Sequence, residues 1–307
     1  MTTTSHPVST VTARINGTEV EVEAGSTVLD ACSIAGVDIP TLCYGPTMTP
    51  ANACRVCVVE VEGSRALVPS CSRKLEDGMD IETDSDRARH SRRLVMELLG
   101  SATELDRAGD QLETWMEDAG ADPARFGIGE PELARHRPSP GHHHPPGAGT
   151  SATVAEPVKI EDDLYVRDYS RCILCYRCVD ACGVEHQNTF AIAVAGRGFD
   201  SRISTEFDVV LPDSACVYCG NCIAVCPTGA LVGKIEFDMR SAGSWDEAHQ
   251  EVTRTVCSYC GVGCNLDLHT QDGKIVKVTS PHDHDVTLGN LCVKGRFGWS
   301  YVSGDSD

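Results

Sequence analysis

The feature that most constrains this chain is a pair of cysteine runs between residues 172 and 226. Each run has the spacing C-x2-C-x2-C-x3-C, and a proline follows the last cysteine of the second run. Gaps of two residues let one tight loop bring three thiolates to the corners of a cage, while backbone N–H groups point at the sulfurs. Two such runs are typical of two [4Fe–4S] clusters. The eight residues are Cys172, Cys175, Cys178 and Cys182 in the first run, and Cys216, Cys219, Cys222 and Cys226 in the second.

The two runs resemble those of bacterial two-cluster ferredoxins, in which the fourth cysteine of each run ligates the other cluster. We therefore expect each fourth cysteine to lie at the start of a helix and to reach across to the neighbouring cage. Zinc is the alternative, but zinc sites use two C-x2-C pairs set well apart rather than four cysteines in eleven residues. The predicted ligand sets are Cys172, Cys175, Cys178 and Cys226 for one cluster, and Cys216, Cys219, Cys222 and Cys182 for the other.

The composition limits the class of protein. At 307 residues the chain has room for two or three small domains, and only 5% aromatic residues favour small cores nucleated on metal. Seventeen cysteines would also suit a secreted disulfide scaffold, but the count is odd and the start lacks a signal-peptide pattern. We therefore expect a cytoplasmic protein. No stretch approaches the ~20 apolar residues of a membrane span, and a net charge of −19 disfavours nucleic acid as a partner.

The first hundred residues predict a hairpin followed by a helix. Apolar and polar residues alternate in 11–23 on both sides of Asn16-Gly17, which is a strong hairpin signal. Ser26 is expected to cap a helix that extends to about residue 35. Cys32 falls within this helix at helical spacing from apolar positions, so we interpret it as a small core residue rather than a metal ligand.

Four more cysteines follow with the spacing C-x10-C-x2-C-x13-C. After a hairpin and a helix, they predict a [2Fe–2S] cluster in a β-grasp fold, although the gaps differ from the plant-type ferredoxin run. The spacing and the stretches IPTLCYGP and ACRVCVVEVEG resemble the large iron–sulfur subunit of respiratory complex I and its relatives among hydrogenases and formate dehydrogenases. Zinc is again the alternative on ligand chemistry alone. The four residues are Cys43, Cys54, Cys57 and Cys71.

The middle of the chain has a different character. Residues 101–126 predict one or two polar helices, and 130–160 are rich in Pro, Gly, Ser and His, as in a solvated linker. The resemblance implies a further [4Fe–4S] cluster here, held by one histidine and three cysteines. Because no cysteine lies between Cys71 and Cys172, we expect that this cluster is absent. His136 and the run 142–144 could bind a metal ion adventitiously, but a solvated linker is the simpler interpretation.

The last segment carries a fourth set of cysteines with the spacing C-x2-C-x3-C-x27-C, which predicts another [4Fe–4S] cluster. Within it, the alternating residues on both sides of Asp272-Gly273 predict a hairpin. The segment resembles the opening of molybdopterin oxidoreductases, formate dehydrogenase above all. This resemblance implies that Lys294 lies between the cluster and the pterin, whereas the alternative is a lysine that balances a nearby anionic cluster. The four cysteines are Cys257, Cys260, Cys264 and Cys292.

Together these segments predict an α+β chain built from small domains. The expected boundaries are a [2Fe–2S] β-grasp domain with a trailing helix at 1–100, a polar helix and linker at 101–160, a 2[4Fe–4S] ferredoxin-type domain at 161–245, and a molybdopterin-oxidoreductase [4Fe–4S] cap at 246–307. The resemblance covers roughly 1–100 and 160–300. It is to the front third of cytosolic, NAD-dependent, molybdopterin formate dehydrogenase.

The expected function is that of an electron-transfer subunit with one [2Fe–2S] and three [4Fe–4S] clusters and no catalytic molybdenum site of its own. The resemblance implies a partner chain that carries a molybdenum or tungsten bis-pterin cofactor, and flavin/NAD diaphorase subunits or a ferredoxin as acceptor. The first alternative is a free-standing multi-cluster electron carrier. A relay subunit of a hydrogenase is the second, although the cysteine motifs of the hydrogenase cluster are missing.

Overall fold

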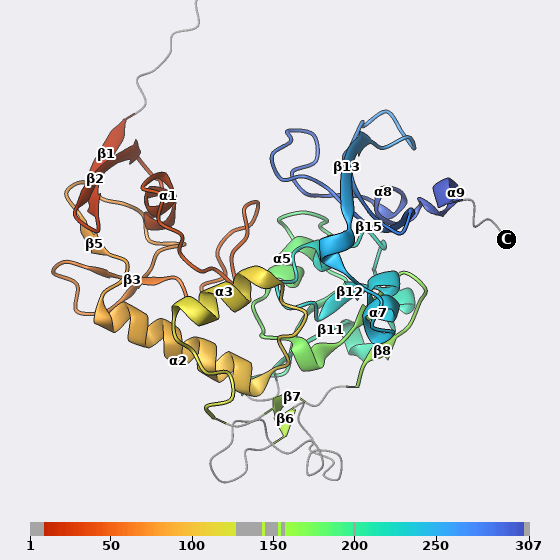
Figure 1. Cartoon of the computed structure of the whole chain (residues 1–307), viewed down its shortest axis with the longest axis horizontal. Helices are drawn as coiled ribbons and strands as arrows, with labels where there is room; N and C mark the ends of the chain where they lie inside the picture. The colour runs from red at the N-terminus through yellow and green to blue at the C-terminus, as the bar shows by residue number, and fades with distance from the viewer. Residues whose placement is uncertain (1–8, 127–142, 145–152, 155–156, 199–200, 304–307) are drawn as a thin grey trace, which may run out of the picture. The chain divides into compact units, whose positions relative to one another are not determined.

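The structure is a computed structural model that describes residues 9–126, 143–144, 153–154, 157–198 and 201–303. The chain divides into two compact units; most of the first is red to yellow and most of the second is green to blue in Figure 1. The first unit comprises Met1–Tyr44, Pro50–Ser101 and Asp110–Gly127. The second comprises Gly45–Thr49, Ala102–Gly109 and Ile128–Asp307. Among the described residues, no helix is both long enough and apolar enough to cross a membrane.

A five-stranded sheet of order β2-β1-β5-β3-β4 forms the core of the first unit (Figure 1). The predicted hairpin is confirmed, because β1 and β2 pair antiparallel around Asn16 and Gly17, whose φ angles are 49° and 80°. β1 pairs with β5 in parallel, and the other pairs are antiparallel. The strands are β1 (Thr10–Ile15), β2 (Thr18–Glu23), β3 (Val58–Val61), β4 (Val68–Pro69) and β5 (Asp80–Glu82).

Helix α1 (Val28–Ile34) packs against this sheet and contributes Val28, Ala31 and Cys32 to the core. The predicted cap was wrong by one residue, because Thr27 rather than Ser26 caps the helix. Thr27 accepts a hydrogen bond from the backbone N–H of Asp30, and the Asp30 carboxylate accepts one from the backbone N–H of Thr27. This reciprocal capping box satisfies two N–H groups that would otherwise have no partner in the first turn.

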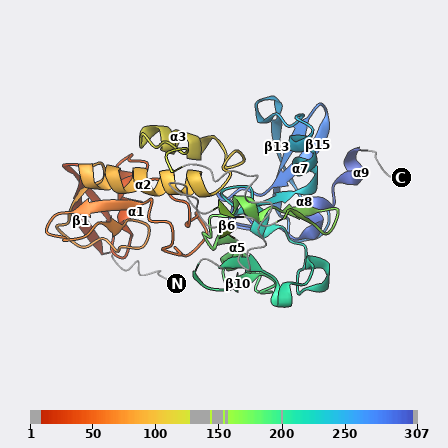
Figure 2. The same cartoon turned by 90° about the horizontal axis from the view of Figure 1, so that it is seen from below.

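Two longer helices complete the first unit. They are α2 (Asp86–Ala102) and α3 (Asp110–Asp118), which Figure 2 shows alongside each other. The predicted polar helix after residue 100 is therefore present as α3. Trp115 of α3 donates a hydrogen bond of 2.8 Å to Asp38, and Ser101 at the end of α2 donates one of 2.8 Å to the carbonyl of Pro123.

The middle of the second unit is built on the three-stranded sheet β12-β9-β8 and the short helices that bear the cysteine runs. Between the two cysteine runs, β10 pairs antiparallel with β11. The strands are β8 (Lys159–Ile160), β9 (Tyr165–Arg167), β10 (Ala193–Ala195), β11 (Arg202–Ser204) and β12 (Leu231–Gly233). The helices are η1 (Tyr169–Arg171), α5 (Arg177–Cys182), η3 (Glu206–Asp208), η4 (Leu211–Asp213), α6 (Asn221–Ala224) and α7 (Lys234–Ser241).

The C-terminal part of the second unit is a three-stranded antiparallel sheet of order β13-β14-β15. The predicted hairpin is confirmed, with Asp272 and Gly273 at φ angles of 52° and 75° in its turn. The edge strand β13 was not predicted. The elements are η5 (Glu247–His249), β13 (Glu251–Val256), β14 (Asn265–Gln271), β15 (Lys274–Thr279), α8 (Val293–Phe297) and α9 (Ser300–Ser303).

Most of the predicted linker, including His136 and His142, lies outside the described residues. Within it, β6 (His143–His144) and β7 (Thr153–Val154) form a two-residue antiparallel pair.

Candidate iron–sulfur cluster sites

The first cysteine quartet gathers in the loops of the first unit. The Sγ atoms of Cys57 and Cys71 lie 3.4 Å apart. A hydrogen bond with the Cys54 thiol lowers the pKa of Cys43 to about 5. The pKa of Cys71 is raised by its hydrogen bond to Cys57, by burial, and by the charges of Cys57, Cys43 and Cys54. The Cys71 sulfur therefore interacts with the other three, as expected of four ligands around one centre.

Two arginines lie near this quartet with different roles. Arg55, between two of the cysteines, is exposed and has a left-handed φ of 62°. Arg92, from α2, is half-buried and donates to the carbonyls of Val56 at 3.2 Å and Thr83 at 3.1 Å. Burial lowers the pKa of Arg92, whereas the charge of Cys57 raises it. Sequence reasoning missed Arg92, because no local pattern connects a residue of α2 with the cysteine loop.

In the second unit, three cysteines of one run lie beside the fourth cysteine of the other run. The pKa of Cys178 is raised by burial and then by the charges of Cys175, Cys226 and Cys172, followed by a weaker effect of Cys222. A small cavity is lined by the same four residues, which are Cys172, Cys175, Cys178 and Cys226.

The other quartet shows the same arrangement. The pKa of Cys222 is raised by burial and by the charges of Cys219, Cys182 and Cys216. A second small cavity is lined by Cys182, Cys216, Cys219 and Cys222. Because each cavity is lined by three cysteines of one run and the fourth cysteine of the other, the side chains present fit the predicted pair of interlocked clusters.

The fourth cysteine of each run does not lie at the start of a helix, and this part of the prediction was wrong. Cys182 is the last residue of α5, and Cys226 comes after α6 and its cap residue Val225. Each helix begins within the run instead, after a left-handed residue: Tyr176 (φ 68°) before α5 and Gly220 (φ 70°) before α6. The third and fourth cysteines of each run are four residues apart. This is about one helical turn, a spacing that places two residues on the same side of a helix.

Backbone and side-chain donors point at the sulfurs of these loops. The N–H of Leu174 donates to the Cys172 sulfur and the N–H of Tyr218 donates to the Cys216 sulfur, both at 3.4 Å. The Tyr165 hydroxyl lies 2.8 Å from the Cys216 sulfur. Burial is the main cause that raises the pKa of Tyr165, so its hydroxyl keeps its proton at neutral pH. Hydrogen bonds of this kind stabilise negative charge on cluster sulfurs.

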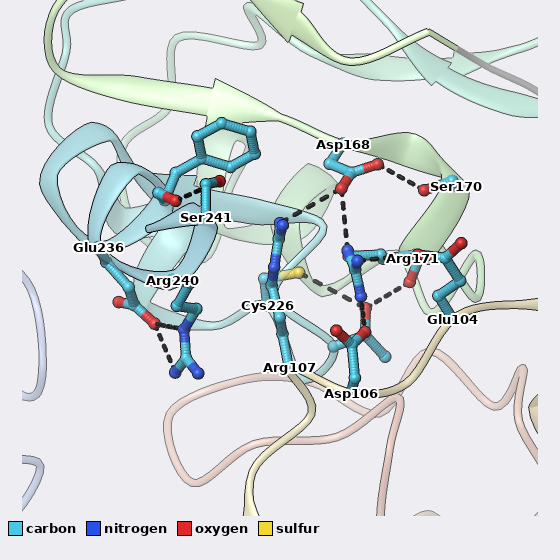
Figure 3. A network of polar contacts seen from close by, with 12 residues as sticks. Glu104, Asp106, Arg107, Asp168, Ser170, Arg171, Cys226, Glu236, Arg240 and Ser241 are labelled. Carbon is cyan, nitrogen blue, oxygen red and sulfur yellow. Dashed lines mark hydrogen bonds and ion pairs between the residues drawn. The ribbon is translucent and has the colours of Figure 1, made fainter. Parts of the chain in front are cut away.

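A network of charges, with Arg171 and Asp168 buried at its centre, braces the loop that precedes Cys172 (Figure 3). Arg171 donates to Asp168 at 2.9 Å and to Glu104 at 2.8 Å, and it also pairs with Asp106. Arg107 donates to the same Asp168 oxygen at 3.2 Å. The network therefore fastens the segment 102–109 to the dicluster loops. Sequence reasoning did not identify it, because its two halves lie more than sixty residues apart in the chain.

The Arg171 backbone also connects the two cysteine runs. Its carbonyl accepts a hydrogen bond of 2.6 Å from the Thr228 hydroxyl, whose oxygen lies 3.9 Å from the Cys226 sulfur. This contact holds the end of the second run against the start of the first.

The fourth quartet lies in the C-terminal sheet domain. Burial and the charges of Cys257, Cys260 and Cys292 raise the pKa of Cys264, so these four thiols also lie near one another. This quartet differs from the others in its exposure: Cys260 and Cys292 are exposed to solvent. Lys294 is exposed as well, and its Nζ lies 5.8 Å from the centre of the Tyr259 ring.

The remaining cysteine is Cys32, which is fully buried in α1, and burial raises its pKa to about 11. Its placement in the core agrees with the interpretation drawn from the sequence. In the described ranges, no group of three or more His, Cys, Asp or Glu side chains is spaced to hold a single metal ion.

Three family profiles match the chain in the order of these sites. They are a 2Fe-2S iron-sulfur cluster binding domain at residues 8–86, a 4Fe-4S dicluster domain at 171–230, and a molybdopterin oxidoreductase Fe4S4 domain at 250–304. The chain is built from iron–sulfur cluster binding domains. The profiles confirm the predicted α+β fold class and support both [2Fe–2S] and [4Fe–4S] cluster types.

Curated relatives match nearly the whole chain. The NADPH-Fe(3+) oxidoreductase subunit alpha of Geobacter sulfurreducens is 34% identical over 301 residues, which cover 95% of this chain and 32% of the relative. A NADH-quinone oxidoreductase subunit of Rhizobium meliloti is 32% identical, covering 94% of this chain and 31% of the relative. A Staphylococcus haemolyticus protein named provisionally as a formate dehydrogenase is 25% identical, covering 95% and 31%.

These matches confirm the resemblance drawn from the motifs. The chain spans about a third of the length of the relatives it matches. A solved structure of a NAD+-reducing [NiFe]-hydrogenase shares its fold, with a TM-score of 0.56 and 24% identity over 73% of this chain and 87% of that chain.

Proposed function

We propose that this chain is the electron-relay subunit of a formate dehydrogenase-type complex. In this proposal a partner chain holds the molybdenum or tungsten pterin site, and flavin/NAD diaphorase subunits or a ferredoxin form the acceptor. Formate oxidation to carbon dioxide releases two electrons and one proton, and NAD+ takes up two electrons and one proton, so the overall reaction balances. Iron–sulfur clusters supply one-electron transfer between the two ends.

The observation that carries the proposal is the grouping of the cysteines into four quartets. Sixteen of the seventeen fall into four quartets whose members interact within each quartet, and only Cys32 lies apart in a core. We assign one [2Fe–2S] cluster to the first quartet and one [4Fe–4S] cluster to each of the other three. The ligands are Cys43, Cys54, Cys57 and Cys71 for the first; Cys172, Cys175, Cys178 and Cys226 for the second; Cys216, Cys219, Cys222 and Cys182 for the third; and Cys257, Cys260, Cys264 and Cys292 for the fourth.

The chain's own residues position these groups and adjust their surroundings. In the dicluster loops, backbone N–H groups and the Tyr165 hydroxyl donate to the sulfurs, and burial excludes water from Cys175 and Cys178. Both effects are among the means by which proteins set cluster potentials. The proposed boundaries of the four parts remain 1–100, 101–160, 161–245 and 246–307.

The exposed quartet is the proposed entry point for electrons. Cys260 and Cys292 are open to solvent, whereas the thiols of the dicluster module are buried or half-buried. Exposure at this site suits contact with a partner protein. Lys294, which is also exposed and follows Cys292 by two residues, is proposed to lie between this cluster and the pterin of the partner.

The proposal is tested on the complex purified from the native cell. We expect the chain to co-purify with a molybdenum- or tungsten-containing protein, and anaerobic formate to reduce the clusters, as seen by low-temperature EPR. A metal-replete chain that is isolated without such a partner, and whose clusters formate does not reduce in cell extract, would favour a free-standing electron carrier instead.

A further inference from the structure

An arginine of the C-terminal domain reaches the loop of the third quartet. Arg296 belongs to α8, which begins directly after Cys292 of the fourth quartet and packs against β15. Its Nε donates to the carbonyl of Cys219, in the loop of the third quartet, at 2.9 Å. The residue therefore connects two cysteine loops that are far apart in the sequence.

Asn221 completes this connection from the opposite loop. Its Oδ1 accepts a hydrogen bond from Arg296 Nη2 at 3.2 Å and another from the backbone N–H of Leu291 at 3.1 Å. Asn221 lies between Cys219 and Cys222, and Leu291 directly precedes Cys292. One amide oxygen thus ties a ligand loop of the third quartet to a ligand loop of the fourth.

The backbone of the third quartet leaves room for this contact. A Cβ at Gly220 would collide with Cδ of Arg296 and would approach Cζ of Phe297 to 3.1 Å. Phe297 in turn stacks on Tyr165, with ring centres 6.3 Å apart, and Tyr165 contacts the Cys216 sulfur. The absence of a side chain at position 220 therefore lets two residues of α8 lie directly on the loop.

Arg296 is also a buried charge with no carboxylate partner among the described residues. It is 5% exposed, and its other acceptors are neutral: the carbonyl of Val278 at 3.4 Å and the amide of Asn221. Burial lowers the pKa of Arg296 to about 10, while the charges of Cys219 and Cys222 raise it. A buried cation without a counter-charge is strongly unfavourable, and the anionic thiolates of the third quartet are the negative groups that act on it.

We propose that Arg296 is a positioning residue that locks the loops of the third and fourth quartets together, and that its fixed charge raises the reduction potential of the cluster held by the third quartet. Reduction adds one electron, and so one negative charge, to that cluster. A positive charge fixed nearby in a water-excluded site favours the reduced form. The proposal rests on the proposed function in one respect, namely that Cys182, Cys216, Cys219 and Cys222 hold a [4Fe–4S] cluster.

The experiment is an EPR-monitored redox titration of the iron-loaded full chain, with dithionite as reductant. The variants are Arg296→Gln, which removes the charge, and Arg296→Lys, which keeps it but removes the planar guanidinium. Arg254→Gln is the matched control, because Arg254 lies in the same sheet domain but is exposed and pairs with Asp267 at 2.8 Å. A Cys219→Ser variant identifies which EPR signal belongs to the third quartet.

We expect Arg296→Gln to lower the equilibrium constant for one-electron reduction of that cluster at least tenfold. This corresponds to a fall of about 59 mV in its reduction potential. In Arg296→Lys and Arg254→Gln, this equilibrium constant is expected to stay within threefold of the wild-type value. An unchanged potential in Arg296→Gln, or an equal fall in Arg296→Lys, would overturn the proposal. A merely structural role would change stability without this difference between glutamine and lysine.

A variant that loses its iron still gives an answer. If Arg296→Gln does not retain iron, Arg296→Met replaces it. Loss of iron in both neutral variants with retention in Arg296→Lys supports the role of the charge, whereas loss in all three overturns it. If the wild-type chain itself holds no iron, the proposed function fails instead, so the two failures are distinguishable.

Discussion

Replacement of Arg171 by methionine tests the charge network around Asp168 in Figure 3 most directly. The Arg171 and Asp168 side chains are 8% and 4% exposed, so their 2.9 Å contact is a buried ion pair. Breaking such a pair by removing one partner costs roughly 3–5 kcal/mol. The expected cost is at the lower end, about 3 kcal/mol, because Arg107 still pairs with Asp168. The contacts with Glu104 and Asp106 add at most about 1 kcal/mol, since those carboxylates are 66% and 68% exposed.

The assay is anaerobic urea unfolding of the iron-loaded chain, followed by far-UV circular dichroism and by the loss of visible cluster absorbance. Arg89→Met is the matched control, because Arg89 pairs with Asp84 and Asp86 and all three side chains are exposed. We expect the control to change the free energy of unfolding by less than about 1 kcal/mol. If Arg171→Met is no more destabilising than Arg89→Met, the network does not brace the dicluster loops and the reasoning is refuted.

Three smaller changes test other parts of the structure. Gly17→Ala places a Cβ at a φ of 80° in the first hairpin turn. It should lower the free energy of unfolding in urea by about 1–2 kcal/mol. An unchanged unfolding midpoint would contradict the turn geometry. Tyr165→Phe removes the hydroxyl beside the Cys216 sulfur and should cost about 1 kcal/mol; its iron content should stay at the wild-type value, and loss of iron would mean that the hydroxyl is required for assembly. Burial lowers the pKa of His269 below its ordinary value near 6.5. The unfolded state therefore binds a proton first as pH falls, and stability should decrease below about pH 6.5. His269→Gln should make this decrease smaller, and an equal decrease in the variant would show that another group is responsible.

Local chemistry made much of the fold predictable. The Asn16-Gly17 and Asp272-Gly273 turns were identified because few other residues adopt positive φ angles at low cost, and both hairpins are present. The cysteine spacings predicted which thiols lie together for a similar reason: a loop with gaps of two residues determines the positions of its own side chains. The crossover between the two runs came from the resemblance to two-cluster ferredoxins, because the spacing within one run does not say which cage its fourth cysteine reaches.

The errors and omissions concern competition between neighbours and contacts over long range. Ser26 and Thr27 are both good caps, and the choice depends on the carboxylate of Asp30, which lies three residues after Thr27. Strand β13 was missed because its sequence, EVTRTV, has only two apolar residues, four positions apart, and therefore no clear apolar/polar alternation. Arg171 and Arg296 were missed because their partners are remote in the sequence, and spacing within a motif carries no information about them.

The central claim is that sixteen cysteines form four iron–sulfur sites on one chain. The most direct measurement is the iron, sulfide and zinc content of the anaerobically purified chain, combined with low-temperature EPR of the reduced protein. We expect about fourteen iron atoms per chain, from one two-iron and three four-iron centres, with EPR signals of both types. A preparation that binds zinc in place of iron, or that shows [4Fe–4S] signals without a [2Fe–2S] signal, would contradict it.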